Sequence, residues 1–226
     1  MEPFTYIDKG TGRALLILPG WGFHPFVIDP ALLNFDLVIP SRPLLNPLFL
    51  VNQVNQIIKK NSSKELNMLG WSLGARLALD TVLAAPQLFK KTVLVSLPSP
   101  FDKKVIAEKH EQLEKDLNKA LKGFYMSVFQ DNIKAYKRFK KEQEGLCLSF
   151  WTKESLVEGL EILARPLPQG IENIRNLLII HGTRDTICPI GRLPALSKEN
   201  KQKTVILDCG HAPFLIQDFY DAINNL

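Results

Sequence analysis

The sequence has few cysteines, and their spacing along the chain does not suggest a metal site. Only Cys147, Cys188 and Cys209 occur in 226 residues, and their spacing matches no metal-ligand pattern. An odd and sparse set of cysteines offers no disulfide framework, so we expect a reduced, cytoplasmic protein. A disulfide-stabilised secreted domain and a cysteine-based metal domain are therefore excluded, and nothing implies a metal or an organic cofactor.

Long apolar runs and a strong charge are also lacking. No apolar stretch approaches the roughly 18 residues that a membrane helix needs. Residues 1–4 show no basic segment that leads into an apolar run, so we expect no signal peptide. The net charge of +5 is mild. It permits an acidic partner, but we expect neither a nucleic-acid partner nor a membrane partner.

What remains is the composition of an ordinary globular domain. Hydrophobic residues make up 46% of the chain and charged residues 23%, which are close to the averages for such domains. The chain is long enough to bury a substantial core. The sequence has no internal repeat and no low-complexity tract, so we expect one α/β domain that is a monomer.

Short apolar runs alternate with segments of helical spacing. The apolar runs predict strands at 14–18, 37–39, 66–69, 92–97, 177–181 and 204–207, and the weaker pattern at 4–8 fits a hairpin or an edge strand. Helical spacing occurs at 51–60, 73–84, around 191–199 and at 213–226. This alternation predicts a mainly parallel sheet flanked by helices, with functional groups beyond the carboxyl ends of its strands.

The strand pattern disappears between about residues 99 and 170. Charged segments with helical spacing replace it at 103–122, 124–141 and 153–164. We therefore predict a core made of 1–98 and 171–226, with 99–170 inserted as a helical lid.

The most informative stretch is Gly-Trp-Ser-Leu-Gly at 70–74. It lies between a predicted strand and a predicted helix, which is the context of a nucleophile elbow with Ser72 at its apex. Glycines flank the serine because such a turn has no room for Cβ atoms. We predict that Ser72 is a nucleophile; the alternative is a helix start that happens to contain this pattern.

A serine nucleophile needs a base and an acid that orients the base. Of the four histidines, only His211 follows a strand end in the chain order serine, acid, histidine; His24, His110 and His181 do not. Asp185, after the turn at 182–184, is the preferred acid. Asp102 is the more serious alternative, and Asp208 lies too close to His211 in sequence to reach its ring.

An ester-cleaving site also needs backbone N–H groups for the developing oxyanion. Leu73, directly after the nucleophile, supplies one of them. Trp21 lies between two glycines at the end of the first buried strand and is the candidate for the second, although it could also be a core residue.

With these motifs, the sequence resembles the α/β-hydrolases, and more narrowly the pimeloyl-[acyl-carrier protein] methyl ester carboxylesterases of biotin synthesis. The stretches that carry the resemblance are 20–22, 70–74, 181–185 with Pro189, 210–214 and Gly-Leu-Glu-Ile-Leu at 159–163. In this sequence Pro19 stands where many relatives have a histidine, and Ala75 where a glycine is common. The resemblance implies a serine esterase with the triad Ser72, Asp185 and His211 and an oxyanion hole of Trp21 and Leu73.

The resemblance also implies where the substrate binds. Trp21 and the stretch 124–128 correspond to the acyl pocket: Phe124, Tyr125, Met126, Ser127 and Val128. The ester would be carried on an acidic acyl-carrier protein. Basic residues of the lid would dock this carrier, and Lys134, Lys137, Arg138 and Lys141 share one helical face. A solvated helix face explains the same charges.

Two alternatives remain open. The chain could be a general short-chain carboxylesterase or another α/β-hydrolase with a different acyl substrate, because the sequence does not reveal the lid's pocket. It could also be a catalytically idle binding protein on this fold, although all three triad residues are retained.

Overall fold

The strands form one sheet in the order β1-β3-β2-β4-β5-β6-β7. The computed structural model describes residues 2–60, 65–193 and 204–226. Its strands are β1 (Phe4–Ile7), β2 (Arg13–Leu18), β3 (Asp36–Pro40), β4 (Glu65–Trp71), β5 (Thr92–Val95), β6 (Leu177–Gly182) and β7 (Thr204–Leu207). β1 is antiparallel to β3, and the other neighbouring pairs are parallel. The predicted α/β class is confirmed, and the segment at 4–8 is an edge strand.

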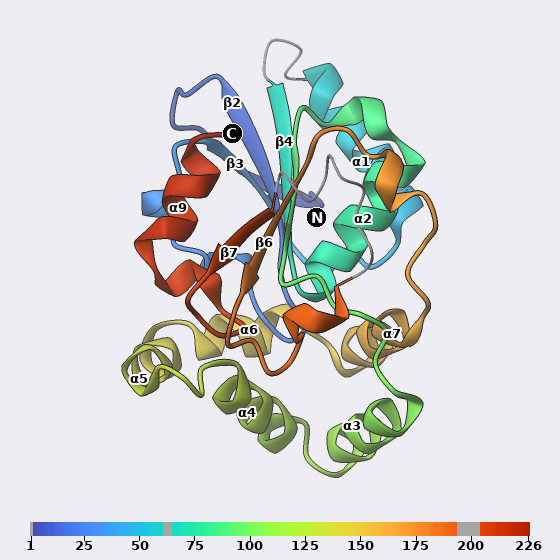
Figure 1. The fold of residues 1–226 in the computed structure, drawn as a ribbon, viewed down its shortest axis with the longest axis vertical. Coiled ribbons are helices and arrows are strands. Elements are labelled where there is room, and N and C mark those ends of the chain that lie inside the picture. The colour runs from blue at the N-terminus through green and yellow to red at the C-terminus, as the bar shows by residue number, and fades with distance from the viewer. Residues whose placement is uncertain (1, 61–64, 194–203) are drawn as a thin grey trace.

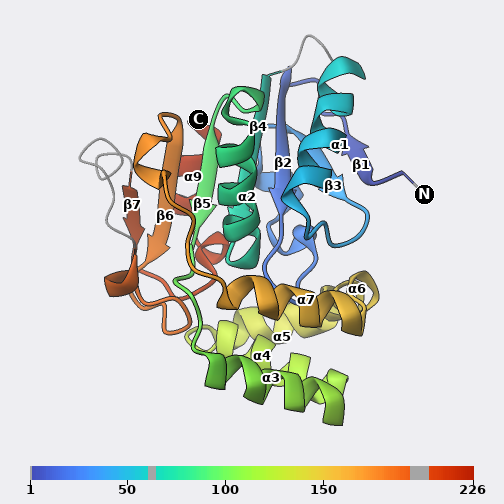
Figure 2. The same ribbon diagram turned by 90° about the vertical axis from the view of Figure 1, so that its right-hand side faces the viewer.

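Helices cover both faces of this sheet. Helices α1 (Pro47–Lys60) and α2 (Leu73–Ala84) lie on one face, and α9 (Gln217–Asn224) lies on the other (Figures 1 and 2). Strands β3 and β5 are buried along their whole length, as expected of parallel strands covered on both sides. Short 3₁₀ turns occur at Pro25–Val27, Pro30–Leu32, Pro86–Leu88, Ile171–Asn173, Ile190–Arg192 and Pro213–Leu215.

Two of the predicted helices lie near the C-terminal end of the chain. The helix predicted at 213–226 is divided, because Ile216 is extended between the turn at Pro213–Leu215 and α9. The helix expected around 191–199 lies mostly outside the described residues. None of the helices in the described ranges has the length and apolar character needed to cross a membrane.

Five helices connect β5 to β6. They are α3 (Lys103–Lys115), α4 (Leu117–Val128), α5 (Ile133–Glu142), α6 (Glu144–Phe150) and α7 (Lys153–Ala164). They lie beyond the carboxyl ends of the parallel strands (Figure 2). The helix predicted at 153–164 is α7 and is confirmed, whereas the two longer helices predicted at 103–122 and 124–141 were wrong in their bounds. Asp116 and Asn132 interrupt them, because their side chains accept from the N–H groups of Lys119 and Ala135 and so begin α4 and α5.

The turn from β4 into α2 has no space for side chains at its two glycines. A Cβ atom on Gly70 would collide with the carbonyl of Gly74, and one on Gly74 would collide with the carbonyl of Leu18. Between them, Ser72 has φ 55° and ψ −115°, a conformation that costs a residue with a side chain about 1–3 kcal/mol. The close approach of β4, α2 and β2 keeps Ser72 in this conformation at the carboxyl end of β4.

Candidate active site

The structure brings Ser72, His211 and Asp185 together at the carboxyl end of the sheet. The Nε2 atom of His211 lies 3.1 Å from the Ser72 Oγ, and its Nδ1 lies 2.8 Å from the Asp185 Oδ2. The three residues follow β4, β7 and β6, and each is buried. This is the geometry of a nucleophile, a general base and an acid that orients the base.

Backbone N–H groups hold the Asp185 carboxylate in place. Its Oδ1 accepts hydrogen bonds from the N–H groups of Ile187 and Cys188, at 3.0 and 2.7 Å. Burial by itself would raise the pKa of Asp185, but the hydrogen bond and charge of His211 and the Cys188 N–H hold this pKa below its usual value. An ionised Asp185 can therefore fix the orientation of the imidazole.

The alternative acids do not reach His211. Asp102 accepts a hydrogen bond from the N–H of Lys104 at 2.7 Å and begins α3. Asp208 forms an exposed ion pair with Arg184 at 3.1 Å. Of the three acids that the sequence offered, Asp185 is the one that contacts the imidazole.

The other three histidines lie outside the contact between Ser72 and Asp185. His24 accepts from the Phe26 N–H and begins a 3₁₀ turn, and burial lowers its pKa to about 4. His110 lies on α3. His181 lies buried near Asp185, with its Nε2 2.6 Å from the carbonyl oxygen of Cys188, and burial lowers its pKa.

Two residues that the sequence did not single out hold the loop of His211. The indole Nε1 of Trp71 donates to the His211 carbonyl at 2.8 Å, and its ring lies against the imidazole at a centroid distance of 5.5 Å. Asp131, between α4 and α5, accepts from the Gly210 N–H at 2.8 Å. The sequence places Trp71 directly before Ser72, which is a signal that it lies near the site. The contact of Asp131 with Gly210 has no such signal, because it depends on how the insertion packs against the loop of His211.

Hydrogen bonds to the insertion hold the loop that follows β2. The Trp21 Nε1 donates to the Leu156 carbonyl at 2.7 Å. The Tyr125 hydroxyl donates to the Gly22 carbonyl at 2.7 Å, and the Trp151 Nε1 donates to the carbonyl of residue 23 at 2.8 Å. The backbone around Trp21 is thus fixed by α4, α7 and the residue after α6.

A pocket of about 320 Å³ opens onto Ser72. Its lining is mostly apolar and comes from the loop after β2, the insertion and the loop after β6: Trp21, Ser72, Phe101, Val105, Ile106, Lys109, Phe124, Ser127, Leu160, Leu163, Thr186, Ile187 and Arg192. Three of the residues expected to bind substrate, Trp21, Phe124 and Ser127, lie on this wall.

The other three residues expected in the pocket lie elsewhere. Tyr125 and Val128 are fully buried in the core, and Met126 is 56% exposed. Phe124 and Ser127 share one face of α4 because they are three residues apart, and Tyr125 and Val128 share the next face. The expectation for Tyr125, Met126 and Val128 therefore needs correction. Tyr125 positions the loop at Gly22 instead.

The basic residues of α5 lie away from this pocket wall. Lys134, Lys137, Arg138 and Lys141 are exposed, and Arg138 pairs with Glu142 at 2.8 Å. Lys134 and Arg138 line a separate cavity of about 470 Å³ between α5 and the core. The pocket at Ser72 has its own basic residues, Lys109 and Arg192.

Solved structures share this architecture over nearly the whole chain. An esterase from Exiguobacterium antarcticum aligns with a TM-score of 0.81 and 18% identity, covering 98% of this chain and 94% of that one. The enol-lactonase from Burkholderia xenovorans LB400 aligns with a TM-score of 0.75 and 15% identity, covering 98% and 94%. This chain has the α/β-hydrolase fold.

Curated proteins of known name also resemble this chain in sequence. The pimeloyl-[acyl-carrier protein] methyl ester esterase of Wigglesworthia glossinidia brevipalpis is 26% identical over 248 residues, covering 97% of this chain and 95% of the relative. The protein of the same name from Nitrosomonas europaea is 24% identical and covers 91% of both. No protein-family profile matches the chain. The chain resembles these esterases along almost its entire length.

Proposed function

We propose that this carboxylic ester hydrolase works as a serine esterase, with Ser72 as nucleophile, His211 as general base and Asp185 as the orienting acid. The observation that carries this proposal is the pair of contacts of His211, to the Ser72 Oγ at 3.1 Å and to Asp185 at 2.8 Å. His211 takes the proton of Ser72 as the hydroxyl attacks the ester carbonyl, and returns it to the departing alcohol. Water activated by His211 then releases the acid from the serine.

The N–H groups of Leu73 and Trp21 are proposed to stabilise the oxyanion of this reaction. Leu73 is the first residue of α2, where N–H groups have no acceptor within the helix and the helix dipole favours negative charge. Trp21 contributes from the loop that the insertion holds in place. Removing one such donor costs about 2.7–4 kcal/mol of transition-state stabilisation in comparable sites.

The proposed substrate is the methyl ester of a pimeloyl group carried on an acyl-carrier protein. This proposal rests on the names of the relatives that cover nearly the whole chain. The pocket agrees with it: about 320 Å³ lies near the lower limit of roughly 300–1,000 Å³ for ligand pockets, which suits one short acyl chain. We further propose that residues 99–170 act as the lid over the core of 1–98 and 171–226, since α3, α4 and α7 line this pocket.

The carrier is proposed to dock on the basic face of α5. Lys134 and Lys141 are exposed and seven residues apart, so they lie on the same side of the helix with Lys137 and Arg138. An acidic carrier would meet this face through long-range attraction, which mainly speeds encounter and weakens with salt.

Serine chemistry is tested with Ser72→Ala and a small nitrophenyl ester. We expect a loss of turnover of about 10⁴-fold or more, with an unchanged circular dichroism spectrum. A fluorophosphonate should label the native protein and leave Ser72→Ala unlabelled. A well-folded native protein that shows neither turnover nor labelling would support the idle binding protein instead.

The substrate is tested by comparing a carrier-bound pimeloyl methyl ester with the small ester. We expect Lys134→Glu combined with Lys141→Glu to reduce kcat/KM for the carrier-bound ester while small-ester hydrolysis is retained. Lys90→Glu combined with Lys91→Glu is the matched control, because these lysines precede β5 at the opposite end of the sheet. Equal losses on both substrates would remove the docking proposal, and an active protein that ignores pimeloyl esters would indicate a general esterase.

A further inference from the structure

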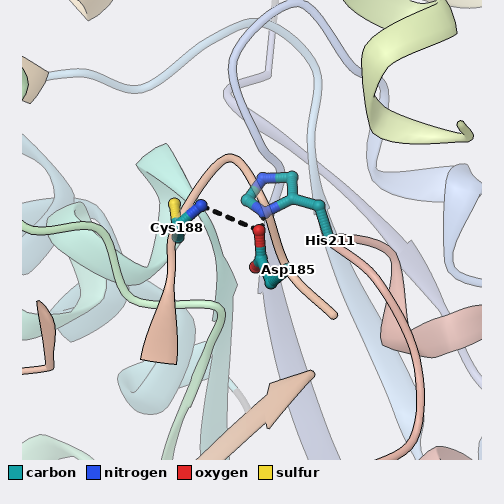
Figure 3. Close-up of side chains that lie close together, drawn as sticks. All are labelled: Asp185, Cys188 and His211. Carbon is teal, nitrogen blue, oxygen red and sulfur yellow. Dashed lines mark hydrogen bonds and ion pairs between the residues drawn. The ribbon is translucent and has the colours of Figure 1, made fainter. Parts of the chain in front are cut away.

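One buried thiol lies inside the cluster at Ser72 and has no part in the proposed reaction. Ligand atoms of Asp185, Cys188 and His211 lie within 4.8 Å of one another, and all three residues are buried. Figure 3 shows Cys188 and His211 on either side of Asp185, with the Cys188 N–H bonded to the carboxylate.

This donor set has the chemistry of a zinc site. Zinc and related soft cations bind thiolate, imidazole and carboxylate groups, commonly with three protein ligands and one further position. Atoms bound to one zinc at about 2.0–2.3 Å lie roughly 3.3–3.7 Å apart, so modest side-chain rotations bring the three groups into range. Within the described residues, this is the cluster of histidine, cysteine and acid side chains that meets this spacing.

From this geometry we infer that Asp185, Cys188 and His211 form a binding site for Zn²⁺ or Cd²⁺ whose occupation stops catalysis. Both imidazole nitrogens are already engaged, Nδ1 with Asp185 and Nε2 with Ser72. A cation on either nitrogen therefore replaces a hydrogen bond that the proposed reaction needs. The pocket is lined by Ser72 and Ile187, which neighbour these ligands, and is the proposed route of entry for a cation.

The charges of the complex balance. On binding, the Cys188 thiol releases one proton to solvent, a sulfur–metal bond replaces the sulfur–hydrogen bond, and no oxidation takes place. Where the cation takes the Nδ1 atom of His211, the proton of that nitrogen moves to Nε2, so the imidazole stays neutral. The thiolate and the Asp185 carboxylate then neutralise the two charges of the cation, which suits a buried site. Without metal, burial and the charge of Asp185 raise the pKa of Cys188 well above its usual value, so the neutral thiol does not compete with Ser72.

The first test measures inhibition on the full chain. Zn²⁺ and Cd²⁺ are titrated into the nitrophenyl-ester assay in chelator-free buffer, with Mg²⁺ as the control because it prefers oxygen ligands in octahedral geometry. We expect saturable inhibition by Zn²⁺ and Cd²⁺ that a chelator reverses, and no inhibition by Mg²⁺. The absence of inhibition by both soft cations would overturn the inference.

The second test assigns the inhibition to Cys188. For Cys188→Ala and Cys188→Val, each measured against its own metal-free rate, the half-inhibiting concentration should rise at least about tenfold. The control is Cys147→Ser, a buried cysteine that instead contacts the N–H of His24; this variant should keep the native sensitivity. Equal sensitivity in native and Cys188 variants would refute the site.

The third test does not depend on esterase activity. Cd²⁺ added to the native chain should produce the ultraviolet cadmium–thiolate band with one equivalent, and Cys188→Ala should lack it. Should the Cys188 variants fail to fold, Cys147→Ser combined with Cys209→Ser leaves Cys188 as the one thiol of the sequence. A one-equivalent band in that double variant supports the site, and its absence overturns the inference.

Discussion

A single methyl group on α7 should disturb the proposed oxyanion hole. A Cβ atom on Gly159 would lie 2.8 Å from the Trp21 Cδ1 and 2.9 Å from the Leu73 Cδ2. These are the two residues whose N–H groups are proposed to bind the oxyanion. Gly159→Ala therefore tests whether their positions matter to the reaction.

The size of the disturbance follows from the contacts. Carbon atoms prefer separations of about 3.5–4.0 Å, so Trp21 or α7 must move by roughly 1 Å. The side chain of Leu73 can rotate, but the Trp21 ring is held by its bond to Leu156 at 2.7 Å and lies edge-on to Phe124 at 5.0 Å. A misplacement of about 1 Å in a catalytic site can cost around 10²-fold in rate. We therefore expect kcat/KM to fall by roughly 10- to 100-fold.

Stability changes less than activity in this variant. Overpacking costs about 1–3 kcal/mol, whereas alanine gains about 1 kcal/mol over glycine in a helix. The net loss of unfolding free energy is therefore about 0–2 kcal/mol. Activity decides the question, and urea denaturation only shows that the variant is folded.

Gly123 provides the matched control. It also lies inside an insertion helix, α4, and a Cβ atom there has nothing within 4 Å. Gly123→Ala should raise stability by up to about 1 kcal/mol and keep full activity on the nitrophenyl ester. Unchanged activity in Gly159→Ala would refute the reasoning, and so would equal losses in both variants.

Three further predictions concern charge and buried polar contacts. Asp185→Asn should lower kcat on the nitrophenyl ester by about 10⁴-fold with little change in Tm; near-native kcat would contradict the orienting role. His24 has its pKa lowered from 6.5 to about 4 by burial, so its neutral form contributes stability above pH 6.5 that is lost as the pH falls towards 4. His24→Asn, which keeps an acceptor for the Phe26 N–H, should therefore show a smaller fall of Tm over this range, and an equal fall would count against the argument. Arg76 is buried on α2 and donates to the carbonyls of residues 165 and 166, just after the last helix of the insertion. Arg76→Leu should cost about 1–3 kcal/mol in urea denaturation, and an unchanged midpoint would show that these bonds contribute little.

Local sequence pattern was sufficient for the architecture. Apolar runs such as 14–18 and 177–181 predicted the buried strands β2 and β6, and the glycines around Ser72 marked the sharp turn between β4 and α2. Because parallel strands end at one edge of a sheet, the residues that follow β4, β6 and β7 were expected to meet. The observed approach of Ser72, Asp185 and His211 follows from this rule together with the chain order of the three residues.

The insertion was predicted less well because its details depend on tertiary contacts. Asp116 and Asn132 end up as capping residues, yet the same residue types also occur on exposed helix surfaces. Likewise, the spacing of 124–128 shows that Phe124 and Tyr125 lie on different faces of α4, but not which face meets the pocket. The rotation of α4 against the core decides that Phe124 lines the pocket and that Tyr125 bonds Gly22.

The sequence by itself therefore determined the α/β class, the strand and turn at each candidate residue and the chemical types available there, because these follow from periodicity and from backbone sterics. Tertiary structure alone decided that Cys188 lies within the Asp185–His211 cluster, that Trp71 holds His211 and that Gly159 lies against Trp21. Such contacts join residues far apart in the chain, and the direction of each side chain is set only when helices and loops pack together.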